Sequence, residues 1–267
     1  MRIDAISTPQ DAVAKGGPPV PLLEINRVTL QYKTMDCVVT ATQQVSFIVY
    51  PADRFILLGP SGCGKSTLLK AIAGFLPPVS GEIRLHGKAV EQPGPDRMMV
   101  FQEFDQLLPW KTVRQNVEFA LKTSGCLRGA EAAGRAAHYI EKVGLLQFID
   151  SYPHTLSGGM KQRVSIARGM AMEPDVLLMD EPFAALDALT RRKMQDELLQ
   201  LWDDTRFTLL FVTHSIEEAV RLGTRILLLS RHPGQVKAEL NGLANCDIDT
   251  SRQSELMARI NSLLFAE

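Results

Sequence analysis

A glycine-rich segment, residues 59–67, carries the residue types needed to bind a polyphosphate. It reads Gly-Pro-Ser-Gly-Cys-Gly-Lys-Ser-Thr and matches the pattern G-x-x-x-x-G-K-[ST]. Glycines let backbone N–H groups curl around phosphate oxygens, the start of the following helix adds partial positive charge, and Lys65 reaches the β and γ phosphates. Ser66 is expected to ligate Mg²⁺. A glycine turn that only caps a helix is the alternative, and the complete pattern disfavours it. The segment predicts a site for ATP and Mg²⁺ lined by Gly59, Pro60, Ser61, Gly62, Cys63, Gly64, Lys65, Ser66 and Thr67.

Two adjacent acidic residues follow an apolar run, Val176–Met179. Because ligands bind at the carboxyl ends of strands in open parallel sheets, Asp180 is placed where a metal is needed. Asp180 can hold Mg²⁺ through water, as the corresponding acid of P-loop NTPases does, and Glu181 can orient or polarise the attacking water. The two acids could instead be a solvated strand end before Pro182. The phosphate segment already needs an acidic partner for its metal, so the pair predicts hydrolysis of the nucleotide.

A third segment, residues 156–163, reads Leu-Ser-Gly-Gly-Met-Lys-Gln-Arg and precedes a predicted helix that runs to about Met172. Ser157 offers a hydroxyl group, and Gly158 and Gly159 offer backbone N–H groups at the start of that helix, where an anion binds favourably. Taken alone, such a segment more often only begins a helix. Together with the phosphate segment and the acidic pair, it resembles the signature motif of ABC transporter ATPases.

The resemblance to this family covers about residues 22–234 and implies roles for further residues. Gln102 is implied to lie in the glutamine loop and to act at the metal, and Asp187 is implied to belong to the D-loop at the nucleotide. His214 is implied to sense the γ phosphate, although a polar residue satisfied at a strand end is the alternative. Tyr32 is implied to stack on adenine, although an aromatic residue on an edge strand can simply pack. The implied catalytic set is Glu181, His214, Gln102 and Lys65, and the implied metal set is Ser66, Gln102 and Asp180.

The resemblance also implies a dimer. In this family two cassettes meet head to tail, and the signature motif of one closes over the nucleotide held by the phosphate loop of the other. Two departures from the family pattern are visible: Met160 replaces the commoner glutamine, and Ser215 follows His214 where aspartate is usual. Neither lies at the metal, water or phosphate-loop positions. We therefore expect a homodimer that hydrolyses ATP.

The segments at residues 100–110 and 112–117 look like those of the nitrate, sulfonate and taurine branch of bacterial importers. This resemblance implies a groove that receives a coupling helix from integral membrane permease subunits, with Leu108, Pro109 and Trp110 as contacts. Trp110 could instead fill the core of a helical subdomain. The branch further implies an indirect partner, a solute-binding protein, and a peripheral location at the cytoplasmic face of the bacterial inner membrane.

The spacing of apolar residues along the chain predicts the strands and helices that position these residues. Two alternating segments, residues 22–32 and 40–49, predict half-exposed antiparallel strands. Unbroken apolar runs separated by helical patterns predict buried parallel strands with crossover helices. These strands are expected at residues 54–58, 176–179, 208–212 and 225–229, and the helices at 68–73, 113–121, 131–143, 191–202, 216–221 and 255–264.

The predicted fold class is α/β, a P-loop NTPase core with a parallel sheet, an antiparallel β subdomain and an inserted helical subdomain. Residues 1–21 are expected to be a disordered leader and residues 22–250 the ATP-binding domain. The helical subdomain is expected at about residues 108–171, and a C-terminal packing helix at residues 251–267.

Composition excludes several classes of protein. The chain has 267 residues, of which 45% are hydrophobic, so it can bury a core without disulfide bonds or structural metals. Its 29 basic and 30 acidic residues leave a net charge of −1, which argues against a groove for nucleic acid. No run approaches the roughly 18 apolar residues of a membrane-spanning helix. The scattered cysteines, without metal or disulfide spacing, favour a reducing compartment: Cys37, Cys63, Cys126 and Cys246.

Three alternative functions use the same motifs. An ABC ATPase of DNA repair or translation usually carries paired cassettes or a long coiled-coil insertion, and neither is present here. A module that binds nucleotide without hydrolysis has no need of intact Lys65, Asp180, Glu181 and His214. An exporter often fuses its cassette to membrane segments. We therefore expect an ATPase subunit that powers the import of a small solute.

Overall fold

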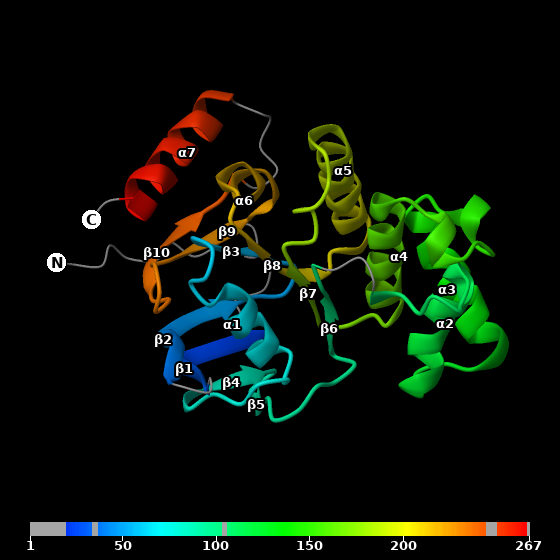
Figure 1. The fold of residues 1–267 in the computed structure, drawn as a ribbon, viewed down its shortest axis with the longest axis horizontal. Coiled ribbons are helices and arrows are strands. Elements are labelled where there is room, and N and C mark those ends of the chain that lie inside the picture. The colour runs from blue at the N-terminus through cyan, green and yellow to red at the C-terminus, as the bar shows by residue number, and fades with distance from the viewer. Residues whose placement is uncertain (1–19, 34–36, 103–105, 244–249, 266–267) are drawn as a thin grey trace.

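The computed structural model describes residues 20–33, 37–102, 106–243 and 250–265. The leader expected at residues 1–21 lies outside the described residues apart from its last two. Within the described ranges, no helix combines the length and the apolar character needed to cross a bilayer. The strands of these ranges form two sheets, and the helices flank them (Figure 1).

The larger sheet has six strands in the order β10-β9-β3-β8-β7-β6. Strands β6 to β9 and β3 run parallel, whereas β10 pairs antiparallel with β9 at the edge. Every residue of β3, β7, β8 and β9 is buried, because both faces of the sheet are covered, and this explains their unbroken apolar runs. The bounds are β3 Arg54–Leu58, β6 Arg97–Val100, β7 Val176–Asp180, β8 Thr208–Thr213, β9 Arg225–Leu229 and β10 Val236–Asn241.

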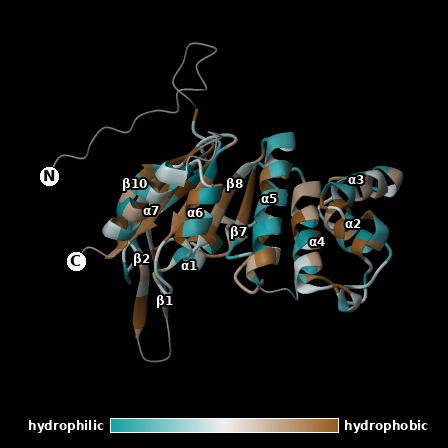
Figure 2. Cartoon of the chain, turned by 90° about the horizontal axis from the view of Figure 1, so that it is seen from above, coloured by the Kyte–Doolittle hydropathy of each residue, from teal (hydrophilic) through white to brown (hydrophobic). Residues whose placement is uncertain are grey.

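Seven α-helices accompany the sheets in the described ranges; in Figure 2 strands β7 and β8 are mainly apolar, whereas α5 carries many polar residues. Their bounds are α1 Lys65–Ile72, α2 Val113–Thr123, α3 Gly129–Lys142, α4 Gly158–Ala171, α5 Ala188–Thr205, α6 Ile216–Leu222 and α7 Thr250–Phe265.

Side chains of the larger sheet alternate between two hydrophobic cores. In β8, Leu209 and Phe211 pack with residues of α2 to α7. Leu210 and Val212, on the opposite face, pack with residues of α1 and of the smaller sheet. This alternation follows from the two-residue period of a strand. The parallel sheet is thus a rigid layer whose carboxyl edge presents the loops that follow β3, β7 and β8.

The smaller sheet is antiparallel and has the order β2-β1-β4-β5. Leu23 of β1 lies opposite Val49 of β2 on one side and opposite Leu85 of β4 on the other, which gives the strands a common apolar face. The bounds are β1 Leu23–Lys33, β2 Val38–Val49, β4 Ser80–Leu85 and β5 Lys88–Ala89. The predicted pair of antiparallel strands is confirmed, and β4 and β5 join it as strands that the sequence pattern did not indicate.

The helical part begins with α2, later than residue 108. Thr112 accepts a hydrogen bond from the Gln115 backbone N–H, and the Gln115 side chain accepts one from the Thr112 N–H, so a capping box fixes the start of α2. Residues 108–112 therefore form a turn rather than a helix. Two short 3₁₀ helices, Leu146–Phe148 and Pro153–Thr155, separate α3 from α4. In both views α2 and α3 lie at the opposite end of the molecule from β1 and β2 (Figures 1 and 2).

Candidate active site

The phosphate segment links the end of β3 to the first turn of α1. Gly64 has φ +96°, and a Cβ atom there would lie 2.5 Å from the carbonyl oxygen of Ala41 in β2. Glycine is therefore required twice over, by the left-handed backbone and by the close strand. No side chain caps the start of α1. Its first N–H groups are consequently available to an anion, as the sequence predicts.

Lys65 is 4% exposed, and its ammonium group lies along the inside of this segment. The Nζ atom donates hydrogen bonds to the carbonyl oxygens of Gly59 at 2.8 Å and Pro60 at 2.9 Å. It also lies 3.9 Å from Oε1 of Glu181. The positive charge is thus held between the phosphate segment and the end of β7.

Cys63 is buried beneath the same segment. Burial raises the pKa of the Cys63 thiol, although the nearby charge of Lys65 opposes this shift. A thiol with a raised pKa is a poor nucleophile at neutral pH. Cys63 therefore acts as a small packing residue in the segment.

Ser66 and Asp180 meet between α1 and β7. The Ser66 hydroxyl donates a 2.8 Å hydrogen bond to Oδ1 of Asp180. Burial raises the pKa of the Asp180 carboxyl, and the hydrogen bond from Ser66 partly offsets this. A cation at this point would stabilise the charged carboxylate in the same way as any neighbouring positive charge.

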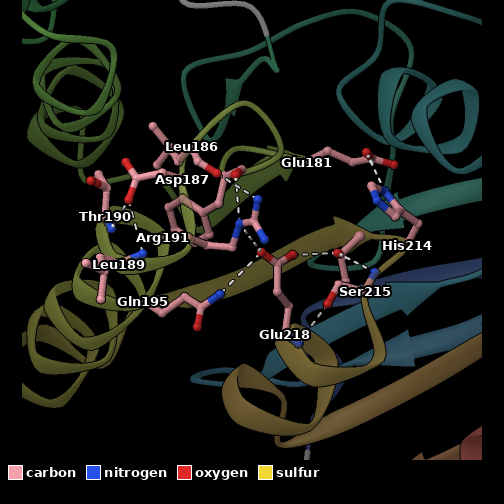
Figure 3. Close-up of polar contacts among 12 residues, drawn as sticks. Glu181, Leu186, Asp187, Leu189, Thr190, Arg191, Gln195, His214, Ser215 and Glu218 are labelled. Carbon is pink, nitrogen blue, oxygen red and sulfur yellow. Dashed lines mark hydrogen bonds and ion pairs between the residues drawn. The ribbon is translucent and has the colours of Figure 1, made fainter.

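Glu181 and His214 are joined across the ends of β7 and β8. Glu181 has φ +43°, an uncommon value for a residue with a side chain, and its N–H donates to the carbonyl of Val212. Oε2 of Glu181 lies 2.8 Å from Nδ1 of His214 (Figure 3). The structure therefore brings together four residues predicted from the sequence: Lys65, Asp180, Glu181 and His214.

The signature segment does not lie on the phosphate segment of its own chain. Ser157 caps α4, its hydroxyl accepting a hydrogen bond from the Met160 N–H at 3.3 Å, and Gly158 and Gly159 form the first turn of that helix. In both views α4 is separated from α1 along the long axis of the molecule (Figures 1 and 2). An anion held by Ser157 would therefore be a different one from that held by Lys65, unless a second chain supplies one of the two.

Three other predicted residues lie at exposed positions. Tyr32 in β1 is 49% exposed, and Gln102 is exposed two residues after β6. Asp187 caps α5 by accepting hydrogen bonds from the N–H groups of Thr190 at 3.0 Å and Leu189 at 3.1 Å. These hydrogen bonds, that from Thr190 first, lower the pKa of Asp187. The roles of Tyr32, Gln102 and Asp187 at a nucleotide remain predictions.

The segment before α2 presents an aromatic side chain to solvent. Trp110 is 69% exposed, so the alternative in which it fills the helical core is wrong. The turn that contains Trp110 is held by hydrogen bonds from Asn116, which is fully buried. Asn116 Oδ1 accepts from the Leu108 N–H at 2.8 Å, and Nδ2 donates to the carbonyls of Lys111 and Thr112 at 3.0 Å. The exposure of Trp110 is thus built into the fold.

We expect Asn116→Ala to destabilise the protein by about 1–3 kcal/mol, because it removes the side-chain partners of the partly buried Leu108 N–H and Lys111 carbonyl. Urea unfolding followed by circular dichroism measures this change. Arg114→Ala is the matched control, since Arg114 on the same helix makes only an exposed ion pair with Asp150 and should contribute less than about 1 kcal/mol. Equal losses for the two variants would contradict the role given to Asn116.

Sequence reasoning missed a buried carboxylate, Glu218. Ser215 and Glu218 match the capping pattern [ST]-x-x-[DE], which places the glutamate side chain back on the helix start. In the structure the Ser215 hydroxyl does accept from the Glu218 N–H, but the Ser215 N–H donates to Thr213 instead. The Glu218 side chain turns inward. The capping signal was present in the sequence, and the inward direction was not.

The family model for the ABC transporter family matches residues 42–184, which include the phosphate segment and the acidic pair. The chain belongs to this family. This cassette is 54% identical over 203 residues to the taurine import ATP-binding protein TauB of Rhizobium johnstonii, covering 76% of the cassette and 77% of the relative. It is 48% identical over 202 residues to the nitrate import ATP-binding protein NrtD of Synechocystis sp., covering 76% and 75% respectively.

Solved structures agree with the predicted fold class. A dimeric post-hydrolysis state of the ATP-binding cassette MJ0796 with ADP and Pi has a TM-score of 0.72 and 31% identity, covering 82% of the cassette and 98% of that chain. CbiO1 of Clostridium perfringens, part of the transporter complex cbiONQ, has a TM-score of 0.75 and 26% identity, covering 90% and 94%. The cassette is therefore an ATP-binding ATPase with the P-loop fold expected from its sequence.

Proposed function

We propose that the cassette is the ATP-hydrolysing subunit of an import system for a small solute of the nitrate, sulfonate or taurine type. The observation that carries the hydrolytic part is the contact of Glu181 with His214 beside Lys65. The import part is supported by the relatives, which are named for taurine and nitrate import.

The residues of the site fit hydrolysis by in-line attack of water on the γ phosphate. The amides of the phosphate segment and Lys65 bind and neutralise the phosphates. Glu181 accepts a hydrogen bond from the attacking water and orients it. His214 holds the Glu181 carboxylate through Nδ1 and is proposed to sense the γ phosphate. In this proposal the segment after β3 binds the phosphates, and the residues after β7 and β8 carry out hydrolysis.

Mg²⁺ fits the donor atoms present between α1 and β7. Magnesium prefers oxygen ligands and is usually held by one or two protein groups together with substrate phosphates. The Ser66 hydroxyl and the Asp180 carboxylate provide two such oxygens 2.8 Å apart, and we propose Gln102 as a further group. When bound with ATP, the ion neutralises negative charge on the phosphates.

A second copy of the cassette is the proposed partner at the nucleotide. MJ0796, which shares the fold, is dimeric in the state with ADP and Pi. Because α4 lies away from α1 in one chain, Ser157, Gly158 and Gly159 of a second copy are free to close over the phosphate segment of the first. We propose that Asp187 of the second copy also lies at this nucleotide. Tyr32 is proposed to stack on the adenine.

The proposed membrane partners are permease subunits, reached through the exposed turn that holds Leu108, Pro109 and Trp110. An exposed tryptophan beside other apolar residues is typical of a protein interface. The location that follows is the cytoplasmic face of the bacterial inner membrane, with a solute-binding protein as an indirect partner. The net charge of −1 supports a role without nucleic acid.

The test is reconstitution with the permease and the solute-binding protein in liposomes, followed by phosphate release and uptake of taurine, nitrate and small sulfonates. We expect one of these solutes to stimulate ATP hydrolysis and to enter the liposomes. ATP hydrolysis that no membrane partner alters would contradict the transport function. The solutes distinguish the members of the branch from one another.

Trp110→Ala is expected to lower uptake severalfold while phosphate release by the isolated cassette stays unchanged, because Trp110 lies on the surface proposed for the permease. Leu146→Ala is the control, since Leu146 is 47% exposed on the short helix after α3 and has no proposed partner. Co-purification with the permease measures binding independently. Undiminished uptake and co-purification of the Trp110 variant would remove this turn from the interface.

A further inference from the structure

Glu218 of α6 is a buried acidic side chain, 7% exposed, that lies behind the catalytic groups rather than among them. Its Oε2 accepts a 2.6 Å hydrogen bond from the hydroxyl of Thr213, the residue before His214. Its Oε1 accepts a 3.2 Å hydrogen bond from Nε2 of Gln195 on α5. Burying a carboxylate is costly unless polar partners surround it, and these contacts offset that cost.

Arg191, one turn earlier on α5, connects Glu218 to the loop that follows Glu181. Its Nε lies 3.9 Å from Oε1 of Glu218 and donates to the carbonyl of Phe183 at 3.2 Å. Its Nη2 donates to the carbonyl of Leu186 at 2.7 Å. The guanidinium group therefore fixes two backbone carbonyls of the loop between β7 and α5 while it faces the Glu218 carboxylate (Figure 3).

Glu218 thus joins the two chain segments that carry the catalytic pair. On one side it holds Thr213, next to His214, and on the other it holds the loop after Glu181 through Arg191. The side chains of Glu181 and His214 are joined to each other by a single 2.8 Å contact, and His214 is half exposed. The contacts of Glu218 with Thr213 and Arg191 limit how far the end of β8 can shift relative to the end of β7.

We propose that Glu218 is a positioning residue for hydrolysis: through Thr213, Gln195 and Arg191 it keeps His214 and Glu181 in register. This proposal rests on the proposed catalytic roles of that pair. It assigns to α6 a function beyond packing, because the first turn of α6 carries the carboxylate that unites the segments after β7 and β8.

The negative charge is essential to this role. Glutamine has nearly the same shape as glutamate, but its amide nitrogen cannot accept a hydrogen bond. It would therefore place a donor against the Thr213 hydroxyl or against the Gln195 amide, and it would leave Arg191 without its acidic partner. The substitution changes the connection without creating a cavity.

Glu218→Gln in the full-length cassette is expected to lower kcat for ATP roughly tenfold, since small misplacements of catalytic groups slow chemistry strongly. The KM for ATP and the Kd for Mg-ATP should change less than about twofold, because no group that binds phosphate is altered. Glu217→Gln is the matched control: Glu217 is the exposed neighbour in the same helical turn, and its substitution removes the same charge. Equal kcat values for the two variants would overturn the proposal.

A second measurement separates positioning from general loss of structure. In a His214→Ala background Glu218→Gln should lower the single-turnover rate little further, because the pair that Glu218 keeps in register is already broken, whereas a merely structural defect lowers the rate equally in both backgrounds. Thr213→Val keeps the volume and removes the hydrogen bond to Glu218, together with the one that Thr213 accepts from the Ser215 N–H, and it gives the same test should Glu218→Gln fold poorly. Full losses in the His214→Ala background would contradict the proposal.

The failure of this inference is distinguishable from the failure of the proposed function. If Glu181→Gln abolishes turnover and Glu218→Gln does not change it, only the positioning role is wrong. If Glu181→Gln itself turns over normally, the catalytic pair is wrong, and the role of Glu218 falls with it.

Discussion

Glu181→Gln is expected to bind Mg-ATP with unchanged affinity and to hydrolyse it roughly 10²- to 10⁴-fold more slowly, as is typical when a general base is removed. Glutamine keeps the length of the side chain and can still accept from Nδ1 of His214, so the front contact of the pair remains possible. What is lost is the negative charge that draws a proton from the attacking water. Phosphate release in a single turnover measures the rate, and binding of a fluorescent ATP analogue measures the affinity.

Glu173→Gln is a matched control for this variant. Glu173 also has a left-handed backbone, with φ +48°, but it is exposed and interacts with Arg135 and Tyr139, away from the candidate active site. The two substitutions therefore share the chemical change and the backbone constraint, and they differ in location. Hydrolysis by Glu181→Gln at the rate of Glu173→Gln would show that the water is activated by another group.

The parts of the fold that sequence analysis predicted are those in which burial leaves a simple pattern. The buried strands β3, β7, β8 and β9 contain almost only apolar residues, because both of their faces are covered. The phosphate segment was predicted because its backbone demands glycine at defined positions, as the close approach of Gly64 to Ala41 shows. In both cases one local requirement determines the residue types.

The strands that sequence analysis missed are short, exposed or interrupted by charge. β6 has four residues, and it begins with Arg97, a buried arginine whose charge is compensated by Asp96 and by the carbonyl of Gln92. β10 is an edge strand on which most side chains are exposed, so it lacks an apolar run. These strands exist because of the neighbours they pair with, and those neighbours are distant in sequence.

The candidate site divides in the same way. Lys65, Asp180, Glu181 and His214 stand at the ends of predictable strands, so their meeting follows from the strand order. The direction of a side chain does not follow from such a pattern: Glu218 matches a capping motif and yet points inward to Thr213. Contacts of this kind depend on which faces of α5, α6 and β8 meet, and this is decided by tertiary packing.

Lys65→Met is expected to weaken Mg-ATP binding roughly 10- to 100-fold, the range for the loss of a charge-assisted hydrogen bond worth about 1.5–3 kcal/mol. Methionine fills a volume similar to that of the lysine stem, so the buried space is kept while the charge is removed. The ligand can be followed through stability, because a ligand at 100 times its Kd raises the free energy of unfolding by about 2.7 kcal/mol. At the same Mg-ATP concentration, about half of that increase should disappear in the variant for a 10-fold loss of affinity, and most of it for a 100-fold loss.

Lys88→Met is the control for this variant, since Lys88 is exposed on β5 and has no proposed part in binding. Lys65→Arg should not restore affinity, because the Lys65 ammonium lies 4% exposed between two carbonyls, and the larger planar guanidinium cannot take the same position. A variant that lacks the charge at residue 65 and is still fully stabilised by Mg-ATP would mean that the backbone amides alone bind the phosphates. In that case Lys65 would serve the chemistry of hydrolysis, through its 3.9 Å approach to Glu181, rather than the binding of the nucleotide.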